Sequence, residues 1–184
     1  ILPLGPTGFG DSPYQSFSAF AGNPYFIDLD TLKEEGLLLP GEYEDLDYGQ
    51  EETAVDYEKL YRVRFQVLKL AYGRACLAGN AQFERFEREQ SFWLEDYSLY
   101  MAVKRRFGGK SWEEWDEDIR LGRPEAVERY RRLCKEEIGF YKFLQYEFDR
   151  QWTALKAYAN AKGIRIIGDI PIYVAFDSAD SWAS

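Results

Sequence analysis

Two groups of side chains in this sequence could contact a polyhydroxylated, uncharged ligand. One is a single carboxylate, Asp169, which follows an isoleucine-rich stretch. The other lies near the amino terminus, where Asp11, Ser12 and Tyr14 stand in a run rich in glycine and proline. Carboxylates and hydroxyls make the hydrogen bonds that such a ligand needs, and an aromatic ring such as Phe9 can cover its apolar face. These residue types would suit a binding site for such a ligand.

The position of Asp169 depends on a predicted strand. Gly163 ends a long helical run, and residues 165–168 are typical of a short buried strand. Pro171 then stops regular pairing, because proline cannot donate to a central ladder. A carboxylate at the carboxyl end of a buried strand is costly unless partners surround it, and in barrel enzymes this end carries the site. The residues alone leave open a second interpretation, in which Asp169 only caps a backbone amide of the next turn.

The amino-terminal candidates lie in a long predicted loop. Residues 1–4 are typical of a strand, and residues 5–24 are dominated by glycine, proline and small polar residues. Loops of this length in compact domains tend to be functional or disordered, and the aromatic rings argue against disorder. The glycines lack the G-K-[ST] pattern of a phosphate-binding loop. From the residues alone, a simple capped turn formed by residues 11–13 is the favoured interpretation.

Composition excludes several classes of function. The net charge of −9 disfavours binding to nucleic acid, which depends on Lys and Arg. The chain has no histidine, which removes Ser-His-Asp and Cys-His catalysis and most zinc sites, so we assign no metal ligand and expect no cofactor. No apolar run is long enough to span a bilayer, so we expect no membrane partner. Cys76 and Cys134 lie in helical patterns and are interpreted as buried reduced thiols of a cytoplasmic protein.

A predicted block of helices separates the two predicted strands. Apolar residues recur at three- and four-residue steps from Asp56 onward, and another apolar stripe runs from Tyr141 to Lys162. Pro124 suits the first residue of a helix, and Ser111 opens an S-x-x-E capping pattern. A crossover between strands needs only one helix, so this longer block predicts a helical insertion or subdomain between the two strands.

Two strings in the sequence resemble one enzyme family. The stretch from Gly168 to Trp182, G-D-I-P-I-Y-V-A-F-D-S-A-D-S-W, is similar to the third-strand motif of the 4-α-glucanotransferases called amylomaltases or disproportionating enzymes. The related α-amylases carry D-x-x-x-N-H here, whereas this chain has Tyr173 and Val174 in place of Asn and His. The stretch 2–24, L-P-L-G-P-T-G-F-G-D-S-P-Y-Q-S-F-S-A-F-A-G-N-P, is similar to the segment after an early barrel strand in the same family.

The resemblance implies a fold and a division of the chain. It implies an α/β fold, namely a partial TIM (β/α)8 barrel with a large helical insertion between an early strand and the next barrel strand. Residues 1–32 would hold a barrel strand and a sugar-binding loop. Residues 33–162 would hold the mainly helical insertion and a barrel helix, and residues 163–184 a barrel strand and loop.

The resemblance also implies substrate-binding residues. The Ser and Tyr of D-S-P-Y lie at donor sugar subsites in the family, which maps them to Ser12 and Tyr14. The aromatic residue before G-D-S belongs to a secondary glucan-binding surface and is often Tyr; here it is Phe9, so stacking could survive while a phenolic hydrogen bond is lost. Asp11 is grouped with these residues. Asp169 is expected at the floor of the active site, where it would orient neighbouring catalytic groups.

The implied activity is transfer of α-1,4-glucan segments from maltooligosaccharide, starch or glycogen donors to glucose or oligosaccharide acceptors. Retaining transfer needs two carboxyl groups, and the family takes them from later strands, so no catalytic residue is assigned in this chain. The chain begins at Ile1 and ends at Ser184 as a turn starts, so we expect an inactive piece of a longer polypeptide. Two alternatives stay open, an α-amylase-type hydrolase and a non-catalytic glucan-binding module.

Overall fold

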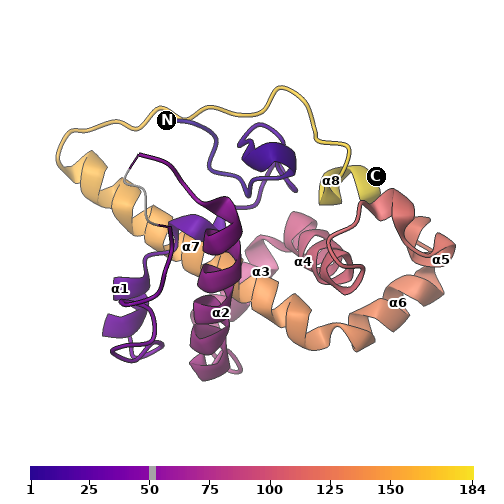
Figure 1. Cartoon of the computed structure of the whole chain (residues 1–184), viewed down its shortest axis with the longest axis horizontal. Helices are drawn as coiled ribbons and strands as arrows, with labels where there is room; N and C mark the ends of the chain where they lie inside the picture. The colour runs from indigo at the N-terminus through magenta and orange to yellow at the C-terminus, as the bar shows by residue number, and fades with distance from the viewer. Residues whose placement is uncertain (50–52) are drawn as a thin grey trace.

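The computed structural model describes residues 1–49 and 53–184, apart from the side chain of Phe9. The regular structure within these residues is helical (Figure 1). The α-helices are α1 (Leu29–Glu34), α2 (Tyr57–Arg74), α3 (Ala81–Glu89), α4 (Ser91–Arg106), α5 (Glu117–Arg120), α6 (Pro124–Leu133), α7 (Lys135–Ala161) and α8 (Ala179–Trp182). Three short 3-10 turns accompany them: η1 (Phe9–Asp11), η2 (Pro24–Phe26) and η3 (Trp112–Glu114).

Local sequence signals account for where several helices begin. The carboxylate of Asp56 accepts a 3.0 Å hydrogen bond from the Lys59 amide and so caps α2. Asn80 caps α3 in the same way, and Pro124 is the first residue of α6 as predicted. The predicted capping box at Ser111 is wrong in detail, because its side chain makes no capping hydrogen bond and only a 3-10 turn follows.

The core lies between the two long helices α4 and α7, with α2, α3 and α6 packed around them (Figure 1). Four large aromatic side chains at its centre are each at most 1% exposed: Tyr97, Tyr100, Phe140 and Phe143. Burial of such rings dominates the stability of a core. The apolar stripe that begins at Tyr141 therefore belongs to the core along the first half of α7. Farther along the same helix, Leu155 is 56% exposed and does not join this core.

The two predicted strands do not form a sheet in the described part of the chain. Residues 1–4 and 165–168 are extended and lie beside one another, and the amino group of Ile1 donates a 2.7 Å hydrogen bond to the carbonyl of Ile167. The isolated bridge in this region joins Thr7 to Ser16. A strand is stabilised by neighbours that satisfy its backbone groups, and a single hydrogen bond does not make a ladder. The expected barrel strands are thus absent from residues 1–49 and 53–184.

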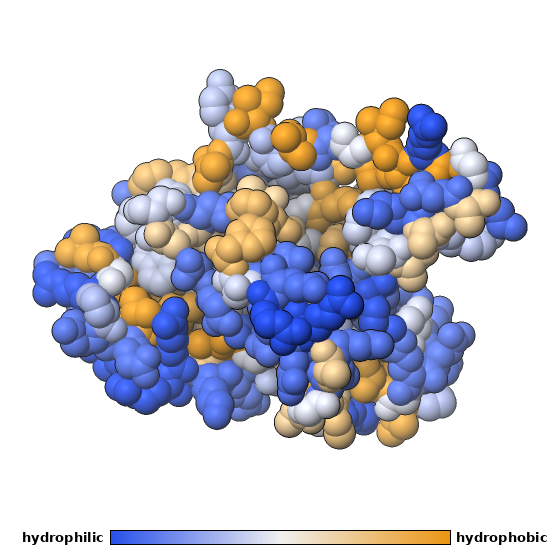
Figure 2. All heavy atoms as spheres, turned by 180° about the vertical axis from the view of Figure 1, so that it is seen from behind, coloured by the Kyte–Doolittle hydropathy of each residue, from blue (hydrophilic) through white to orange (hydrophobic). Residues whose placement is uncertain are grey.

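The carboxyl-terminal segment is correspondingly exposed rather than buried. Side chains of the stretch 164–176 are between 59% and 89% exposed at these positions: Ile164, Ile167, Ile170, Ile172, Tyr173, Val174 and Phe176. Seen from behind, hydrophobic groups gather along the edge where this stretch runs, while the lower helical surface is largely hydrophilic (Figure 2). The prediction that a buried strand precedes Asp169 is therefore wrong for this chain, because nothing described covers that stretch.

The two cysteines differ in environment. Cys134 is buried at 3% exposure, as predicted, and burial raises the pKa of its thiol. Cys76 is exposed and follows the end of α2, so its predicted burial within a helix is wrong. Among the described helices, none combines the length and the apolar character needed to cross a membrane.

Candidate functional site

Tyr14 and Asp169 meet, although 155 residues separate them in the sequence. The phenol hydroxyl of Tyr14 donates a 3.0 Å hydrogen bond to Oδ2 of Asp169. This hydrogen bond is the main reason that the pKa of Tyr14 is raised, with burial and the negative charge of Asp169 adding to it. The amide of Ile170 donates a 2.9 Å hydrogen bond to the other carboxylate oxygen. Asp169 therefore accepts a hydrogen bond from the amide that follows it, as the turn-capping interpretation predicts, and a second one from the amino-terminal loop.

The loop that carries Tyr14 is fastened to helix α7 at its far end. Gln145, which is 2% exposed, donates a 2.9 Å hydrogen bond to the carbonyl of Gly22 and accepts a 2.7 Å hydrogen bond from its amide. A Cβ atom at Gly22 would lie 2.0 Å from the ring of Phe148, so the backbone approaches α7 more closely than any larger residue allows. Glycine and a buried amide thus determine where the loop leaves the helices.

A groove of about 740 Å³ lies between this loop and the carboxyl-terminal segment. Ser12, Tyr14 and Asp169 all line it, together with the apolar stretch from Ile170 to Phe176. The Ser12 hydroxyl accepts a 3.3 Å hydrogen bond from the Tyr14 amide, which braces the turn that presents both side chains. The structure therefore brings three of the five predicted site residues to one groove, with hydroxyl, carboxylate and apolar surface side by side.

The other two predicted residues do not join this groove. Asp11 lies in the left-handed region at φ 55° and lines a second pocket instead. The backbone of Phe9 belongs to the turn η1, but its side chain lies outside the described part of the structure. The single site expected from Asp11, Ser12 and Tyr14 is consequently split by the turn between residues 11 and 14.

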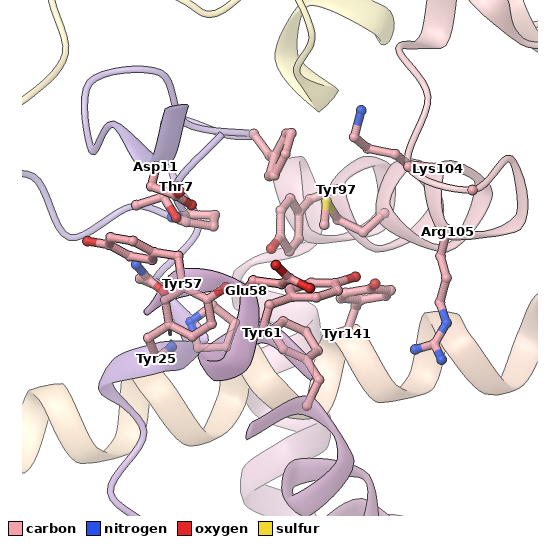
Figure 3. Close-up of a pocket in the computed structure, with 18 residues that line it drawn as sticks. Thr7, Asp11, Tyr25, Tyr57, Glu58, Tyr61, Tyr97, Lys104, Arg105 and Tyr141 are labelled. Atoms are coloured by element: carbon pink, nitrogen blue, oxygen red, sulfur yellow. Dashed lines mark hydrogen bonds between the residues drawn. The ribbon is translucent and has the colours of Figure 1, made fainter. Parts of the chain in front are cut away.

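The second pocket has a volume of about 650 Å³ and is rich in tyrosine (Figure 3). It is lined by the amino-terminal loop, the start of α2, α4 from Tyr97 onward and Tyr141 in the first half of α7. Five tyrosines line it: Tyr25, Tyr57, Tyr61, Tyr97 and Tyr141. Burial raises the pKa of Tyr25 to about 12 and also raises the pKa of Tyr97 and Tyr141. These three phenols therefore stay neutral hydrogen-bonding groups across the physiological pH range.

Sequence reasoning missed this tyrosine pocket. Tyr57 and Tyr61 are one helical turn apart at the start of α2, and the 57/61 spacing places both on one face. That spacing is a local signal, but it does not distinguish a pocket wall from a core stripe. The approach of Tyr25 and Tyr141 to the same space is set by tertiary packing, with the rings of Tyr25 and Tyr57 6.3 Å apart.

The carboxylates of the groove are already engaged by the protein. Asp169 accepts the hydrogen bond of Tyr14, and Asp177 forms a 2.6 Å ion pair with Lys104. Among the residues that the structure describes, no group of three or more His, Cys, Asp or Glu side chains is placed to hold a metal ion. What the groove offers is hydrogen-bonding and apolar surface for an uncharged ligand.

Comparison with known proteins gives consistent matches over the whole chain. The profile of glycoside hydrolase family 77, described as 4-alpha-glucanotransferase, matches residues 1–184. The chain is similar to a 4-alpha-glucanotransferase of Clostridium butyricum, with 50% identity over 184 residues that make up 100% of this chain and 38% of that protein. It is 48% identical over 187 residues to a 4-alpha-glucanotransferase of Thermus thermophilus, which covers 100% of this chain and 36% of that protein.

The fold matches a solved structure as well. The amylomaltase from Streptococcus agalactiae in complex with acarbose superimposes with a TM-score of 0.93 and 44% sequence identity. The superposition covers 99% of this chain and 37% of that one. The chain thus spans rather more than a third of the length of the proteins it matches.

Proposed function

Because this chain belongs to the 4-alpha-glucanotransferase family, we propose that it forms part of an amylomaltase. Such an enzyme transfers α-1,4-glucan segments from maltooligosaccharide, starch or glycogen donors to glucose or oligosaccharide acceptors. The names of its relatives and the amylomaltase neighbour support this activity. The neighbour's complex with acarbose supports a glucan-like ligand for the family's site. We place the enzyme in the cytoplasm.

The groove is the part of this chain that binds the donor in our proposal. Ser12 and Tyr14 supply hydroxyl groups to a sugar, and Asp169 holds the Tyr14 hydroxyl while its remaining acceptor capacity serves the groove. The hydrogen bond between Tyr14 and Asp169 is the observation that carries this assignment, because it joins the two family motifs at one groove. Because this hydrogen bond already holds the two side chains in place, less conformational entropy is lost when a sugar binds.

The tyrosine pocket serves as the secondary glucan-binding surface in the same proposal. Phe9 and Asp11 belong to the turn beside it, and Asp11 lines it directly. Aromatic rings and neutral phenols suit a sugar chain, since rings cover its apolar faces and hydroxyls bind its edges. A volume of about 650 Å³ is in the range of small-molecule sites.

The chemistry itself is assigned to residues outside these 184. Retaining transfer uses one carboxylate as nucleophile and a second carboxyl as acid/base, about 5 Å apart across the scissile bond. In our proposal this chain contributes neither group. Within the complete enzyme it contributes a share of a (β/α)8 barrel: residues 1–32 as a barrel strand and the sugar-binding loop, residues 33–162 as the mainly helical insertion and a barrel helix, and residues 163–184 as a barrel strand and loop. The exposed apolar stretch 164–176 supports this, because such a stretch suits a strand covered on both faces.

The two other functions remain distinguishable from this one. An α-amylase-type hydrolase would use water as acceptor, but Tyr173 and Val174 replace the Asn and His of that branch. A non-catalytic glucan-binding module would function as these 184 residues alone. Its wide apolar exposure, including Ile172 at 89%, disfavours a free-standing module.

The deciding experiment is incubation of the complete polypeptide that carries these residues with maltotriose. We expect glucose together with oligomers longer than maltotriose, which only transfer produces. Shorter sugars alone would indicate the hydrolase. Glucan binding by the 184 residues with no activity from the complete polypeptide would indicate the module. Disproportionation by the 184 residues alone would contradict the assignment of the catalytic groups to other residues.

A further inference from the structure

The carboxylate of Asp180, in the short helix α8, ties two distant parts of the chain together. Its Oδ2 accepts a 2.6 Å hydrogen bond from the amide of Ala19, and its Oδ1 accepts a 3.2 Å hydrogen bond from the hydroxyl of Ser18. Ser18 is only 1% exposed, so its hydrogen bond is partly shielded from water, whereas the hydrogen bond of Ala19 is exposed. The adjacent amide of Ala179 donates a 2.8 Å hydrogen bond to the carbonyl of Phe17. Three consecutive loop residues are thereby fastened to the start of α8.

A second carboxylate, Asp177, fastens the same segment to helix α4. Its Oδ2 pairs with Nζ of Lys104 at 2.6 Å, and its Oδ1 accepts a 2.6 Å hydrogen bond from the hydroxyl of Tyr100. The Lys104 side chain is 8% exposed and also donates a 3.1 Å hydrogen bond to the carbonyl of Lys110. The indole nitrogen of Trp112 donates a 2.9 Å hydrogen bond to the carbonyl of Phe176. Charged and buried contacts therefore hold this end of the groove.

These contacts lie where the two walls of the groove converge. One wall is the loop with Ser12 and Tyr14, and the other is the stretch that begins at Asp169. Phe17 and Asp177 line the groove themselves, and Nζ of Lys104 lies 5.2 Å from the centre of the Phe17 ring. The hydrogen bond between Tyr14 and Asp169 joins the two walls a second time. The separation of the walls is thus set at two places.

We infer that Asp177 and Asp180 form a carboxylate clamp that positions the loop of Ser12 and Tyr14 for the donor sugar. Neither carboxylate is a catalytic residue in this inference, because each acts through the groups it holds. Asp177 fixes the segment on α4, and Asp180 fixes the loop on that segment. The inference rests on the proposed function, since the groove is assigned there as the donor site.

A carboxylate suits the geometry at position 180. Its two oxygens accept from two different donors, the Ala19 amide and the Ser18 hydroxyl. An asparagine at this position has one oxygen and one NH₂ group, so it can accept from the Ala19 amide only as a neutral group and can meet Ser18 only by donating to its hydroxyl. Hydrogen bonds to a charged group are roughly twice as strong as neutral ones. Asp180→Asn is therefore a nearly isosteric change that removes the charge from both contacts and reverses the direction of the hydrogen bond with Ser18.

The test is the kinetics of Asp180→Asn in the complete polypeptide. We expect its KM for maltotriose as donor to rise about tenfold while its KM for glucose as acceptor stays unchanged. A purely structural defect would lower the active fraction, which lowers kcat and leaves both KM values alone. Ser18→Ala should raise the donor KM in the same direction but less, because the Ala19 hydrogen bond survives. Asp180→Glu keeps two acceptor oxygens and should recover part of the loss.

The control variant is Asp45→Asn. Asp45 is an exposed carboxylate in a distant turn, so its replacement should leave both KM values unchanged.

A second measurement tests the carboxylate clamp without an activity assay. Amide hydrogen exchange at Ala19 should be at least tenfold faster in Asp180→Asn than in the unmodified protein, and unchanged in Asp45→Asn. An unchanged donor KM in an active Asp180→Asn enzyme, or unchanged exchange at Ala19, would overturn the clamp. Failure of the unmodified polypeptide to disproportionate maltotriose would instead overturn the proposed function, and the exchange result would still decide the clamp.

Discussion

The hydroxyl of Tyr14 donates a 3.0 Å hydrogen bond to Oδ2 of Asp169, which brings a loop near the amino terminus against a segment near the carboxyl terminus. Each residue belongs to a different family string, and neither string alone shows that they meet. Because of this contact, residues of both motifs line the same groove. It also identifies the side chain whose removal should affect the donor most directly.

Tyr14→Phe should weaken use of the donor without unfolding the protein. The change deletes only the hydroxyl that contacts Asp169, and Tyr14 is 44% exposed, so the loss of packing is small. We expect the donor KM of the complete polypeptide to rise roughly threefold to tenfold, the range for one hydrogen bond to a charged partner near the surface. Tyr158→Phe, an exposed tyrosine of α7, is the matched control. Equal effects of the two variants would contradict the assignment of Tyr14.

Gly22→Ala should displace the loop from helix α7. The added Cβ would overlap the ring of Phe148 at 2.0 Å, and we expect a loss of about 1–3 kcal/mol in the free energy of unfolding. Gly73→Ala is the control, because Gly73 lies within α2 and its added Cβ meets no atom within 4 Å. That control should stabilise the helix by about 0.5–1 kcal/mol. Urea unfolding of the two variants measures both changes in the free energy of unfolding. An unchanged free energy of unfolding in Gly22→Ala would mean that the loop does not approach α7 this closely.

Phe143→Ala should be among the most damaging single changes in the core. The side chain is completely buried between the long helices and leaves a cavity when truncated, so the expected loss is about 3–5 kcal/mol. Leu155→Ala on the exposed part of α7 should stay within about 0.5 kcal/mol of the unmodified chain. Thermal or urea unfolding checks the pair. Comparable losses would show that the outer half of α7 is packed as tightly as its inner half.

Glu147 should give the stability of this chain a specific pH dependence. Burial raises the pKa of its carboxyl above the ordinary 4.5, although Arg150 donates a hydrogen bond to it and opposes the shift. The folded state therefore binds this proton more tightly than the unfolded state does. The stabilising contribution is full below about pH 4.5 and is lost as the pH rises through the folded pKa.

Glu147→Gln removes that titration, and urea unfolding from pH 4 to pH 7 measures it. Relative to the unmodified chain, the variant should gain stability as the pH rises over this window. Glu84→Gln, at an exposed position of α3, is the control for loss of one carboxyl group. If the variant instead loses stability relative to the unmodified chain as the pH rises, the ion pair with Arg150 outweighs burial.

Local sequence signals were sufficient for most of the helical structure. Asp56 and Pro124 mark helix starts that the structure confirms, and the apolar spacing after Tyr141 predicts the inner face of α7. These features depend on hydrogen bonds and side chains only a few residues apart, which is why a sequence encodes them directly. The burial predicted for Cys76 was wrong because it depends on what other elements cover that position.

Part of the candidate site was also predictable from the two stretches that resemble the family. The sequence alone makes Ser12, Tyr14 and Asp169 candidates, and the three share one groove. The departure of Asp11 into the tyrosine pocket was not predictable, because it depends on how the turn of residues 9–14 directs successive side chains. Roles in sugar binding remain predictions for all of these residues.

The sequence by itself determined the starts of some helices, the long glycine-rich loop and the family to which the chain belongs, because each depends on short strings and local spacing. Tertiary structure alone decided which side chains meet, such as Tyr14 with Asp169 and Asp180 with Ala19. It also decided that residues 165–168 stay extended and exposed rather than forming a strand. The reason is that a helix satisfies its backbone hydrogen bonds within four residues, whereas a strand and a site depend on partners far away in the chain.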